Sequence, residues 1–357
     1  MISDIGMLVR TSSGGGAERV ALRLADYYVE NGHSVSYIYY YDTGQYEKNT
    51  KIDTYCLCRR MRSIKLLRTI DEVLQTRRFF KLNKFKSLLI FGYSPAIEFA
   101  ISTLGLKKTC MVIMSERNDP SRNTKKRYID WLRSWAYSKS DKVVFQTEDA
   151  KNYFSDIIKQ KGFVIPNPIE NKFPDRFSGN RIKTIVTAGR LTAQKNLPLL
   201  INAFACLHHD FPDYHLIVYG DGELKEELLN QCRELGIINS VSFPGFDKDC
   251  MIKSRDVAMY VSSSDYEGIS NSILEALCLG IPVVATDCPV GGNRLMIEEG
   301  NSGFLTPTGD EEKLYQKMKL IINSPVLSDK LSRNAIKNRD KFSVEKIAST
   351  WLKLMNE

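Results

Sequence analysis

The sequence lacks a long hydrophobic run. Hydrophobic residues make up 43% of the 357 residues, but no stretch of about 18 consecutive apolar residues occurs, so we expect no transmembrane helix. The N-terminus has no basic segment ahead of an apolar core, so we also expect no secretory signal. These features, with 26% charged residues, are ordinary for a soluble globular protein of two domains.

Clusters of metal-binding and nucleophilic residues are also missing. The eight cysteines are scattered, and the only close pair, Cys56 and Cys58, has no matching His/Cys cluster. We therefore expect reduced thiols in a cytoplasmic protein and no metal site. The sequence shows no Ser-His-Asp or Cys-His arrangement for nucleophilic catalysis. Its four histidines are expected at helix ends or strand starts: His33, His208, His209 and His215.

The common nucleotide fingerprints are absent as well. A glycine loop, Gly14-Gly15-Gly16, follows an expected strand and precedes an expected helix. It is not Gly-x-Gly-x-x-Gly, and no Lys-Ser/Thr follows it, which argues against dinucleotide and ATP binding. Such a loop still lets the backbone approach a phosphate or a sugar closely, although a tight turn alone is the alternative.

Apolar runs alternate with helical patterns along the chain, which is typical of doubly wound parallel α/β sheets. Prolines at 164–169 and a polar stretch at 170–180 indicate a linker. We expect domains at 1–168 and 169–340 and a C-terminal helix within 341–357. The expected strands are 5–9, 34–40, 87–91, 109–114, 142–145, 182–188, 215–219, 240–243, 257–261, 282–285 and 303–305. The expected helices include 17–29, 95–104, 125–138, 148–159, 311–322, 327–339 and 344–354.

The most informative stretch is DYEGISNSILEAL at 265–277, which follows an expected buried strand. Ser270 or Asn271 is the expected N-cap of the helix that it enters. Glu267 then precedes this helix and Glu275 lies in about its second turn, of order 10 Å away at about 1.5 Å per residue. Between them lie the free N–H groups and the positive dipole end of the helix, where phosphate binds readily. A nucleotide-sugar, with hydroxyls at both ends and phosphates between them, would fit.

This stretch also carries a family resemblance. Glu267-x7-Glu275, followed by Ala-Leu-x-x-Gly-Ile-Pro-Val-Val-Ala-Thr-Asp at 276–287, resembles the retaining glycosyltransferases of family 4 (group 1). The resemblance covers essentially the whole chain. It implies the GT-B fold, in which two Rossmann-like domains face a cleft and the last helix crosses back onto the first domain. Glu-Gly-x-x-Asn-x-x-Leu-Glu at 267–275 and Ser-Glu-Arg-Asn at 115–118 are most similar to bacterial enzymes that extend lipid-linked oligosaccharides of capsule or O-antigen.

A second signature, Gly-Arg-x5-Asn, begins at Gly189 and Arg190 and includes Lys195. In the family its cations hold the nucleotide diphosphate, and two cations at a strand end can neutralise an anionic leaving group without a metal. The resemblance implies catalytic roles for Arg190, Lys195 and Glu267, and contacts from Glu275 to the ribose. The other implied donor-binding residues are Gly15, Gly16, Gly189, Gly220, Phe246, Gly268, Ile269, Ser270, Asn271 and Ser272. For Gly220, a plain strand-to-helix turn is an equal alternative.

An acceptor site is expected in the first domain. Glu116 and Arg117 follow a strand where ligands meet such sheets, although a salt-bridged loop is the alternative. Many relatives place a histidine in this part of the cleft, and this chain has none nearby.

The basic residues lie mainly in the first half of the chain. Residues 1–170 hold 28 Lys/Arg against 18 Asp/Glu, whereas the remainder holds 22 against 24. The densest stretch, 59–86, has ten Lys/Arg and two acids among apolar residues, which favours an amphipathic helix on an anionic membrane surface. A solvated helix packed through its apolar side is the alternative, and no motif supports nucleic-acid binding.

The favoured function is therefore transfer of a sugar, with retention, from a nucleotide-sugar that is expected to be UDP-linked. The expected acceptor is a saccharide on polyprenyl diphosphate, in surface polysaccharide biosynthesis on the inner face of the cytoplasmic membrane. We expect no cofactor and no metal requirement. The alternatives are a soluble GT-B enzyme acting on a free small acceptor, a non-catalytic nucleotide-sugar-binding protein and a nicotinamide-dependent dehydrogenase.

Overall fold

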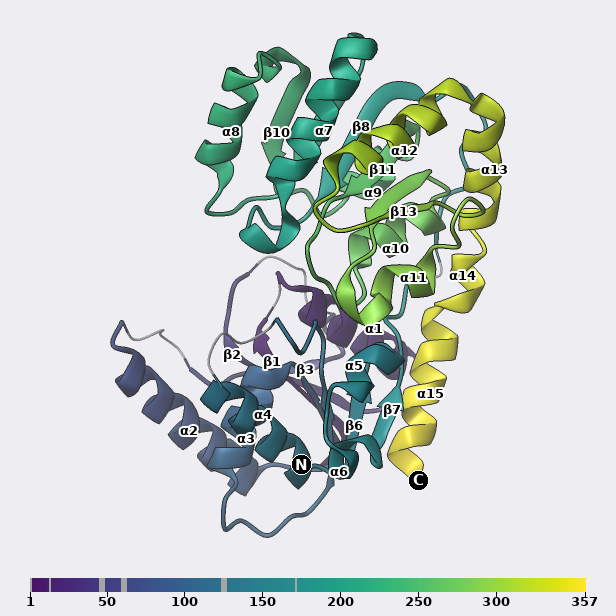
Figure 1. Cartoon of the computed structure of the whole chain (residues 1–357). Coiled ribbons are helices and arrows are strands. Elements are labelled where there is room, and N and C mark those ends of the chain that lie inside the picture. Colours follow the sequence, from purple (N-terminus) through teal and green to yellow (C-terminus); the bar gives the residue numbers. More distant parts are fainter. Residues whose placement is uncertain (1, 13, 45–48, 59–62, 123–126, 171) are drawn as a thin grey trace. The chain divides into compact units, whose positions relative to one another are not determined.

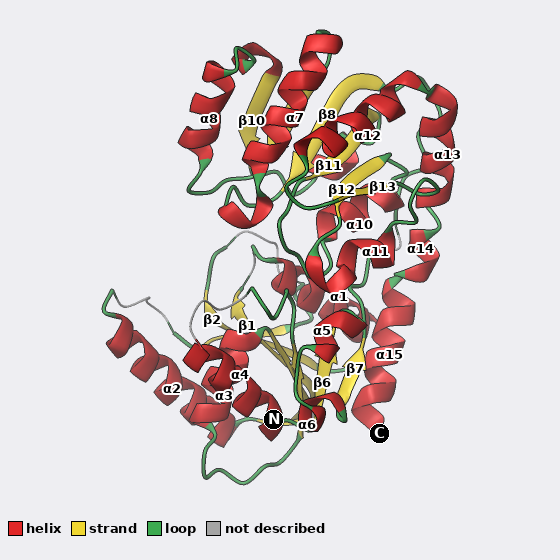
Figure 2. Cartoon of the chain, viewed as in Figure 1, coloured by secondary structure: helices red, strands yellow, loops and turns green. Residues whose placement is uncertain are grey.

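The chain folds into two compact units. A computed structural model describes residues 2–12, 14–44, 49–58, 63–122, 127–170 and 172–357. Unit 1 comprises Met1–Glu170 with Phe342–Glu357, and unit 2 comprises Asn171–Lys341 (Figure 1). Each unit is a parallel sheet covered by helices, so the predicted doubly wound α/β fold is confirmed (Figure 2).

The unit 1 sheet has the strand order β3-β2-β1-β4-β5-β6-β7, and every neighbouring pair is parallel. Because successive side chains of a strand point to opposite faces, Ile5, Met7 and Val9 of β1 enter the core with the helices α1 and α15. The elements of unit 1 are β1 (Ile2–Thr11), α1 (Gly16–Glu30), β2 (Val35–Tyr41), β3 (Asp53–Cys56), α2 (Lys65–Leu82), β4 (Lys84–Phe91), α3 (Tyr93–Ser102), β5 (Met111–Ser115), α4 (Arg127–Lys139), β6 (Lys142–Phe145), α5 (Glu148–Asn152), α6 (Asp156–Lys159), β7 (Gly162–Val164) and α15 (Val344–Asn356).

The unit 2 sheet has the strand order β10-β9-β8-β11-β12-β13, also parallel. Its core gathers side chains from β8, β9, β11 and β12 under the long helices α7 and α12. Its strands and helices are β8 (Ile182–Ala188), α7 (Leu197–Asp210), β9 (His215–Tyr219), α8 (Lys225–Glu234), β10 (Val241–Gly245), α9 (Cys250–Lys253), β11 (Val257–Ser262), α10 (Asn271–Cys278), β12 (Val283–Thr286), α11 (Gly292–Met296), β13 (Phe304–Thr306), α12 (Glu311–Asn323), α13 (Pro325–Ala335) and α14 (Asn338–Lys341). Three short 3-10 helices are η1 (Ala193–Lys195), η2 (Ile238–Ser240) and η3 (Pro289–Gly291).

Two predicted helices are wrong in extent. The helix expected at 148–159 is two short helices, because Thr147 caps α5 and Phe154 turns into the core before Ser155 begins α6. The helix expected at 327–339 is likewise divided into α13 and α14. The strands β3 and β7 were not expected, since they are short and lie at the sheet edges. The start of the helix expected at 125–138 and part of the basic stretch 59–86 lie outside the described residues.

The last helix of the chain belongs to the core of unit 1. Ile347, Ala348, Trp351 and Leu354 of α15 are buried there, and Trp351 lies against Phe91 of β4. Among the described residues, no helix is long and apolar enough to cross a membrane.

Candidate active site

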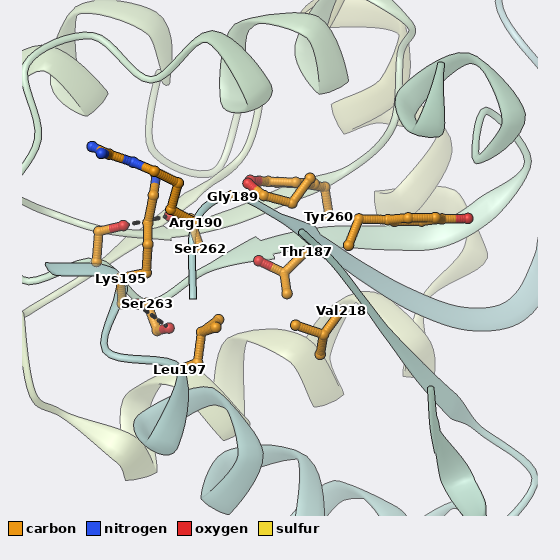
Figure 3. Close-up of a pocket in the computed structure, with 12 residues that line it drawn as sticks. Thr187, Gly189, Arg190, Lys195, Leu197, Val218, Tyr260, Ser262 and Ser263 are labelled. Atoms are coloured by element: carbon orange, nitrogen blue, oxygen red, sulfur yellow. Dashed lines mark hydrogen bonds between the residues drawn. The ribbon is translucent and has the colours of Figure 1, made fainter. Parts of the chain in front are cut away.

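The candidate site lies in unit 2, where the strand order reverses. The chain leaves β8 for β9 on one side and later returns to β11 on the other side of β8. In open parallel sheets, ligands bind at such a point, outside the carboxyl ends of the strands. A pocket occurs at this point (Figure 3). It is lined by Thr187, Ala188, Gly189, Arg190, Lys195, Leu197, Val218, Tyr219, Tyr260, Ser262, Ser263 and Ser264.

Lys195 and Glu267 form an ion pair beside this pocket. Lys195 comes from the turn after β8, whereas Glu267 comes from the loop after β11, so the fold brings together two residues that are 72 positions apart. Burial by itself lowers the pKa of Lys195, but attraction to Glu267 and Tyr260 outweighs it and raises that pKa above its usual value. Lys195 is therefore a positive charge, already paired with a carboxylate.

A network of hydroxyl groups holds the Glu267 side of the pair. Ser264 donates a hydrogen bond of 3.0 Å to the Glu267 carboxylate. The Ser264 carbonyl accepts from Thr286 at 2.6 Å and from the thiol of Cys288 at 3.0 Å. Burial raises the pKa of Cys288 to about 12, so it stays a thiol and can donate. On the other side, Ser263 donates to the Lys195 carbonyl at 3.0 Å.

Glycines let the site loops approach each other. A Cβ on Gly189 would lie 2.8 Å from Cε of Lys195, so the lysine side chain occupies the space that a side chain would take. Gly220 has φ +125°, and a Cβ there would lie 1.9 Å from the Gly189 carbonyl oxygen. Gly292 packs as tightly against the backbone of Gly268, where a Cβ would lie 1.6 Å from the carbonyl oxygen. Larger residues at these positions would push the site loops apart.

The helix α10 begins next to the ion pair. Its N-cap is Ser270, one of the two predicted residues, but the Ser270 side chain makes no capping hydrogen bond. Ser272 donates to the Ala188 carbonyl at 3.1 Å and is also bonded to the Tyr260 hydroxyl at 2.9 Å. These bonds tie the first turn of α10 to the end of β8. Glu275 is buried in the same helix, in its second turn.

Arg190 is the exposed cation of the site. No hydrogen bond or ion pair to its guanidinium occurs among the described residues. Figure 3 shows Arg190 and Lys195 at one end of the pocket, with Val218 toward the other. A guanidinium in this position can offer two parallel N–H donors to a phosphate.

The other predicted donor residues lie in several places. Phe246 is 51% exposed after β10, and its backbone N–H donates to Asp221 at 3.0 Å. Ile269 and Asn271 are buried around the start of α10. Gly15 and Gly16 belong to unit 1, where they form the N-cap and first residue of α1.

The predicted acceptor residues lie within buried networks of unit 1. The Glu116 carboxylate accepts from Arg133 and Tyr137, both at 3.2 Å, and from the Arg117 backbone N–H at 3.1 Å. The Arg117 guanidinium donates to Asn167 at 2.5 Å. Burial raises the pKa of Glu116 against the pull of Arg133, and it lowers the pKa of Arg117 to about 10. These contacts match the alternative of a salt-bridged loop, so an acceptor role for either residue stays a prediction.

Several residues of the site carry no signal in the motifs that predict it. Ser264, Tyr260 and Gly292 were given no role, yet they hold Glu267, the helix start and the Gly268 turn. Ser264 could have been noticed, because it stands three residues before Glu267 at the end of a buried strand. Tyr260 reads as an ordinary core residue, since its hydroxyl meets Ser272 only in the folded chain.

Comparison with known proteins assigns the chain to a family. Residues 169–338 match the family Glycosyl transferases group 1, and residues 14–173 match Glycosyltransferase Family 4. The chain is a group 1 glycosyltransferase. Its fold agrees with this assignment, because Anabaena HepE in complex with UDP and glucose superposes with a TM-score of 0.80 at 18% identity, over 99% of this chain and all of that one.

Two relatives align with almost the entire glycosyltransferase. One, from Haemophilus influenzae, is described only as a glycosyltransferase and is 26% identical over 96% of this chain and 97% of its own. The other, from Campylobacter jejuni, is a GalNAc-α-(1→4)-GalNAc-α-(1→3)-diNAcBac-PP-undecaprenol α-1,4-N-acetyl-D-galactosaminyltransferase. It is 24% identical over 99% of this chain and 98% of its own.

Proposed function

We propose that this glycosyltransferase moves a sugar from a UDP-sugar to a saccharide carried on polyprenyl diphosphate, with retention at the anomeric carbon. One observation carries the donor part: a free arginine, a paired lysine and the start of a helix meet at the switch point of unit 2. The acceptor part is supported by the Campylobacter relative, whose name includes an undecaprenol diphosphate.

Each residue of the candidate site has a proposed task. Arg190 binds the donor diphosphate and Lys195 stabilises the negative charge that develops as it departs, where electrostatic catalysis is most effective. Glu267 holds sugar hydroxyls together with the backbone around 268–271, and Glu275 accepts from the ribose. The acceptor hydroxyl attacks from the side of the leaving group, so no enzymatic nucleophile takes part. Because two cations neutralise the diphosphate, we propose that no metal is needed.

The ion pair between Lys195 and Glu267 bears on how Lys195 reaches the donor diphosphate. The Glu267 carboxylate neutralises the Lys195 ammonium, which keeps a buried charge from standing alone. When sugar hydroxyls engage Glu267, Lys195 can turn toward the diphosphate without large movement of the backbone. We propose that donor binding exchanges the carboxylate partner of Lys195 for a phosphate.

We also propose a peripheral position on the inner face of the cytoplasmic membrane, where a polyprenyl-linked acceptor would be reached. The basic stretch at 59–86 supports this location.

The decisive experiment is a panel of UDP-, GDP- and dTDP-sugars, read by thermal shift and by donor hydrolysis. We expect stabilisation and slow hydrolysis with a UDP-sugar, and weaker nucleotide binding in Glu275→Ala. Product NMR should show the same anomeric configuration as the donor. Transfer to a soluble saccharide with no gain from a polyprenyl diphosphate would favour the alternative of a free small acceptor, and binding without turnover would favour a non-catalytic protein.

A further inference from the structure

Helix α2 of unit 1 buries two polar side chains on its inward face. Glu72 and Thr76 are buried against the unit, and Phe80 continues the same face at the next interval of four residues. On the opposite side Leu66, Ile70 and Leu74, also spaced by four, are 70%, 47% and 58% exposed. Residues at this spacing lie on one face of a helix, so α2 shows an apolar stripe to its surroundings, whereas a surface helix ordinarily buries such a stripe.

Ion pairs and hydrogen bonds explain the inward polar side. Glu72 accepts from Arg10 at 2.7 Å and from the Tyr41 hydroxyl at 2.5 Å, both at the carboxyl ends of strands. Thr76 donates to the Tyr40 hydroxyl at 3.2 Å. These bonds fix the rotation of α2 on the sheet, because turning its leucines inward would break the bonds of Glu72 to Arg10 and Tyr41.

Helix α4 adds exposed aromatic side chains to the same layer of helices. Tyr128 and Trp131, in its first two turns, are 55% and 65% exposed. Figure 2 shows α2, α3 and α4 as neighbours in unit 1, and α3 packs on both of the others. Both α2 and α4 follow strands of a parallel sheet, so both begin at the carboxyl edge of that sheet. Their exposed first turns therefore lie at the edge where such folds meet ligand.

We propose that this face, formed by Leu66, Leu67, Ile70 and Leu74 of α2 with Trp131 of α4, inserts into the surface of an anionic lipid bilayer. The inference rests on the proposed polyprenyl-linked acceptor, whose sugar would then be presented at the carboxyl edge of unit 1. Tryptophan and tyrosine favour the boundary between lipid tails and water.

The charges of α2 favour a bilayer over a second copy of the chain. The helix carries five Lys/Arg against Asp71 and Glu72, and Glu72 is already paired with Arg10. Arg78 and Lys81 are exposed beside the apolar stripe. Two copies meeting through this face would bring like charges together, whereas anionic headgroups would neutralise them while the leucines enter the lipid.

Cosedimentation of the full chain with vesicles tests the proposal. We expect binding to equimolar phosphatidylglycerol and phosphatidylcholine, and much weaker binding to phosphatidylcholine alone. The variant Leu66→Ser/Ile70→Ser/Leu74→Ser should lose about 30-fold or more in vesicle affinity. Arg78→Gln and Lys81→Gln should each lose about fivefold on anionic vesicles only. Blue-shifted Trp131 emission on binding, absent in Trp131→Ser, would place α4 at the same surface.

The control variant is Ile252→Ser/Val326→Ser, which removes exposed apolar side chains from unit 2 and should bind vesicles as the wild type does. Donor hydrolysis in solution should be unchanged in every variant, which separates loss of membrane contact from loss of the proposed activity. Equal vesicle binding by the wild type and the triple variant would overturn the proposal. So would a dimer that the triple variant converts to a monomer in the absence of lipid.

Discussion

At the carboxyl edge of the unit 2 sheet, Arg190 is exposed and Lys195 has Glu267 as its carboxylate partner. At the same edge of unit 1, Arg10 donates two hydrogen bonds to Glu98, at 2.6 and 2.7 Å, and a third to Glu72. Both units thus bring charged groups to the edge where ligands bind. Of these cations, Arg10 of unit 1 has two carboxylate partners, whereas the Arg190 guanidinium of unit 2 has none among the described residues.

The difference teaches that charge near a strand end is no guide to function until its partners are known. In unit 1, buried pairs join helices to the sheet, as Glu116 does with Arg133 of α4. In unit 2, the Arg190 guanidinium has no carboxylate partner among the described residues, and this is the group that we propose binds the donor diphosphate. The comparison predicts that unit 1 charges act mainly on stability and that unit 2 charges act mainly on transfer.

The largest expected effect on stability comes from Glu116→Ala. It leaves the fully buried Arg133 guanidinium with the partly exposed Asp130 as its remaining carboxylate partner, and we expect a loss of about 3 kcal/mol in the free energy of unfolding. Urea denaturation measures it. The matched control is Lys108→Ala, which breaks an exposed pair with Asp141 and should cost less than about 1 kcal/mol. Similar losses in the two variants would contradict a structural role for the Glu116 network.

Lys195→Ala should act mainly on transfer, whereas Glu116→Ala should act mainly on stability. Removal of one group that stabilises a leaving diphosphate should lower kcat about 100- to 1000-fold, with a much smaller change in donor affinity. Steady-state transfer assays and donor titration separate the two. Lys183→Ala, at an exposed pair with Asp213 in the same unit, should retain wild-type kcat. Equal turnover of wild type and Lys195→Ala would refute the leaving-group role.

Gly220→Ala should open the loops of the unit 2 site. A Cβ there would collide with the Gly189 carbonyl in addition to straining a backbone at φ +125°, and we expect a loss of about 3 kcal/mol with weaker donor binding. Gly236→Ala is the control, because Gly236 also has positive φ but its Cβ would meet nothing within 4 Å. It should cost about 1 kcal/mol and leave donor affinity unchanged. A similar cost for both variants would show that strain, not packing, dominates.

Glu98 should make unit 1 sensitive to pH. Burial, aided by nearby Glu72 and opposed by Arg10, raises the pKa of Glu98 to about 7 from an ordinary value of 4.5. Because Glu98 holds its proton more tightly in the folded chain than in the unfolded chain, protonation of Glu98 stabilises the fold. This contribution to the free energy of unfolding is fully present below pH 4.5 and is lost as the pH rises through about 7. The free energy of unfolding of the wild type should therefore fall by up to about 3 kcal/mol relative to Glu98→Gln between pH 4.5 and 8. A constant difference across that range, measured by urea denaturation, would exclude this linkage.

Ser264→Ala should have the smallest effect. It removes one hydrogen bond to Glu267 while Lys195 still pairs with that carboxylate, so we expect about a tenfold rise in donor KM and little change in stability. Ser262→Ala is the control, because the Ser262 hydroxyl meets the Ser264 hydroxyl at 3.3 Å and no bond from Ser262 to Glu267 occurs among the described residues. Unchanged KM in Ser264→Ala would mean that Lys195 alone positions Glu267.

Most of the fold follows from the sequence. Parallel sheets buried on both faces require long apolar runs separated by helical patterns, and these patterns place most strands within a few residues of their observed ends. The failures have local causes: β3 is too exposed to show a pattern, and the turn at Phe154 divides one expected helix into two. In the same way, the motifs at 189–196 and 265–275 predict the candidate site residues, because helix starts and glycine turns are local features.

The sequence by itself determined the two sheets, a helix start at Ser270 or Asn271 and the residue types offered to an anionic ligand. Only the tertiary structure decided which partner each charged side chain has. It paired Lys195 with Glu267 across 72 positions, placed Glu116 in a buried network and turned the leucines of α2 outward. The physical reason is that a local pattern fixes backbone conformation, whereas the partner of a charged side chain depends on contacts between distant segments.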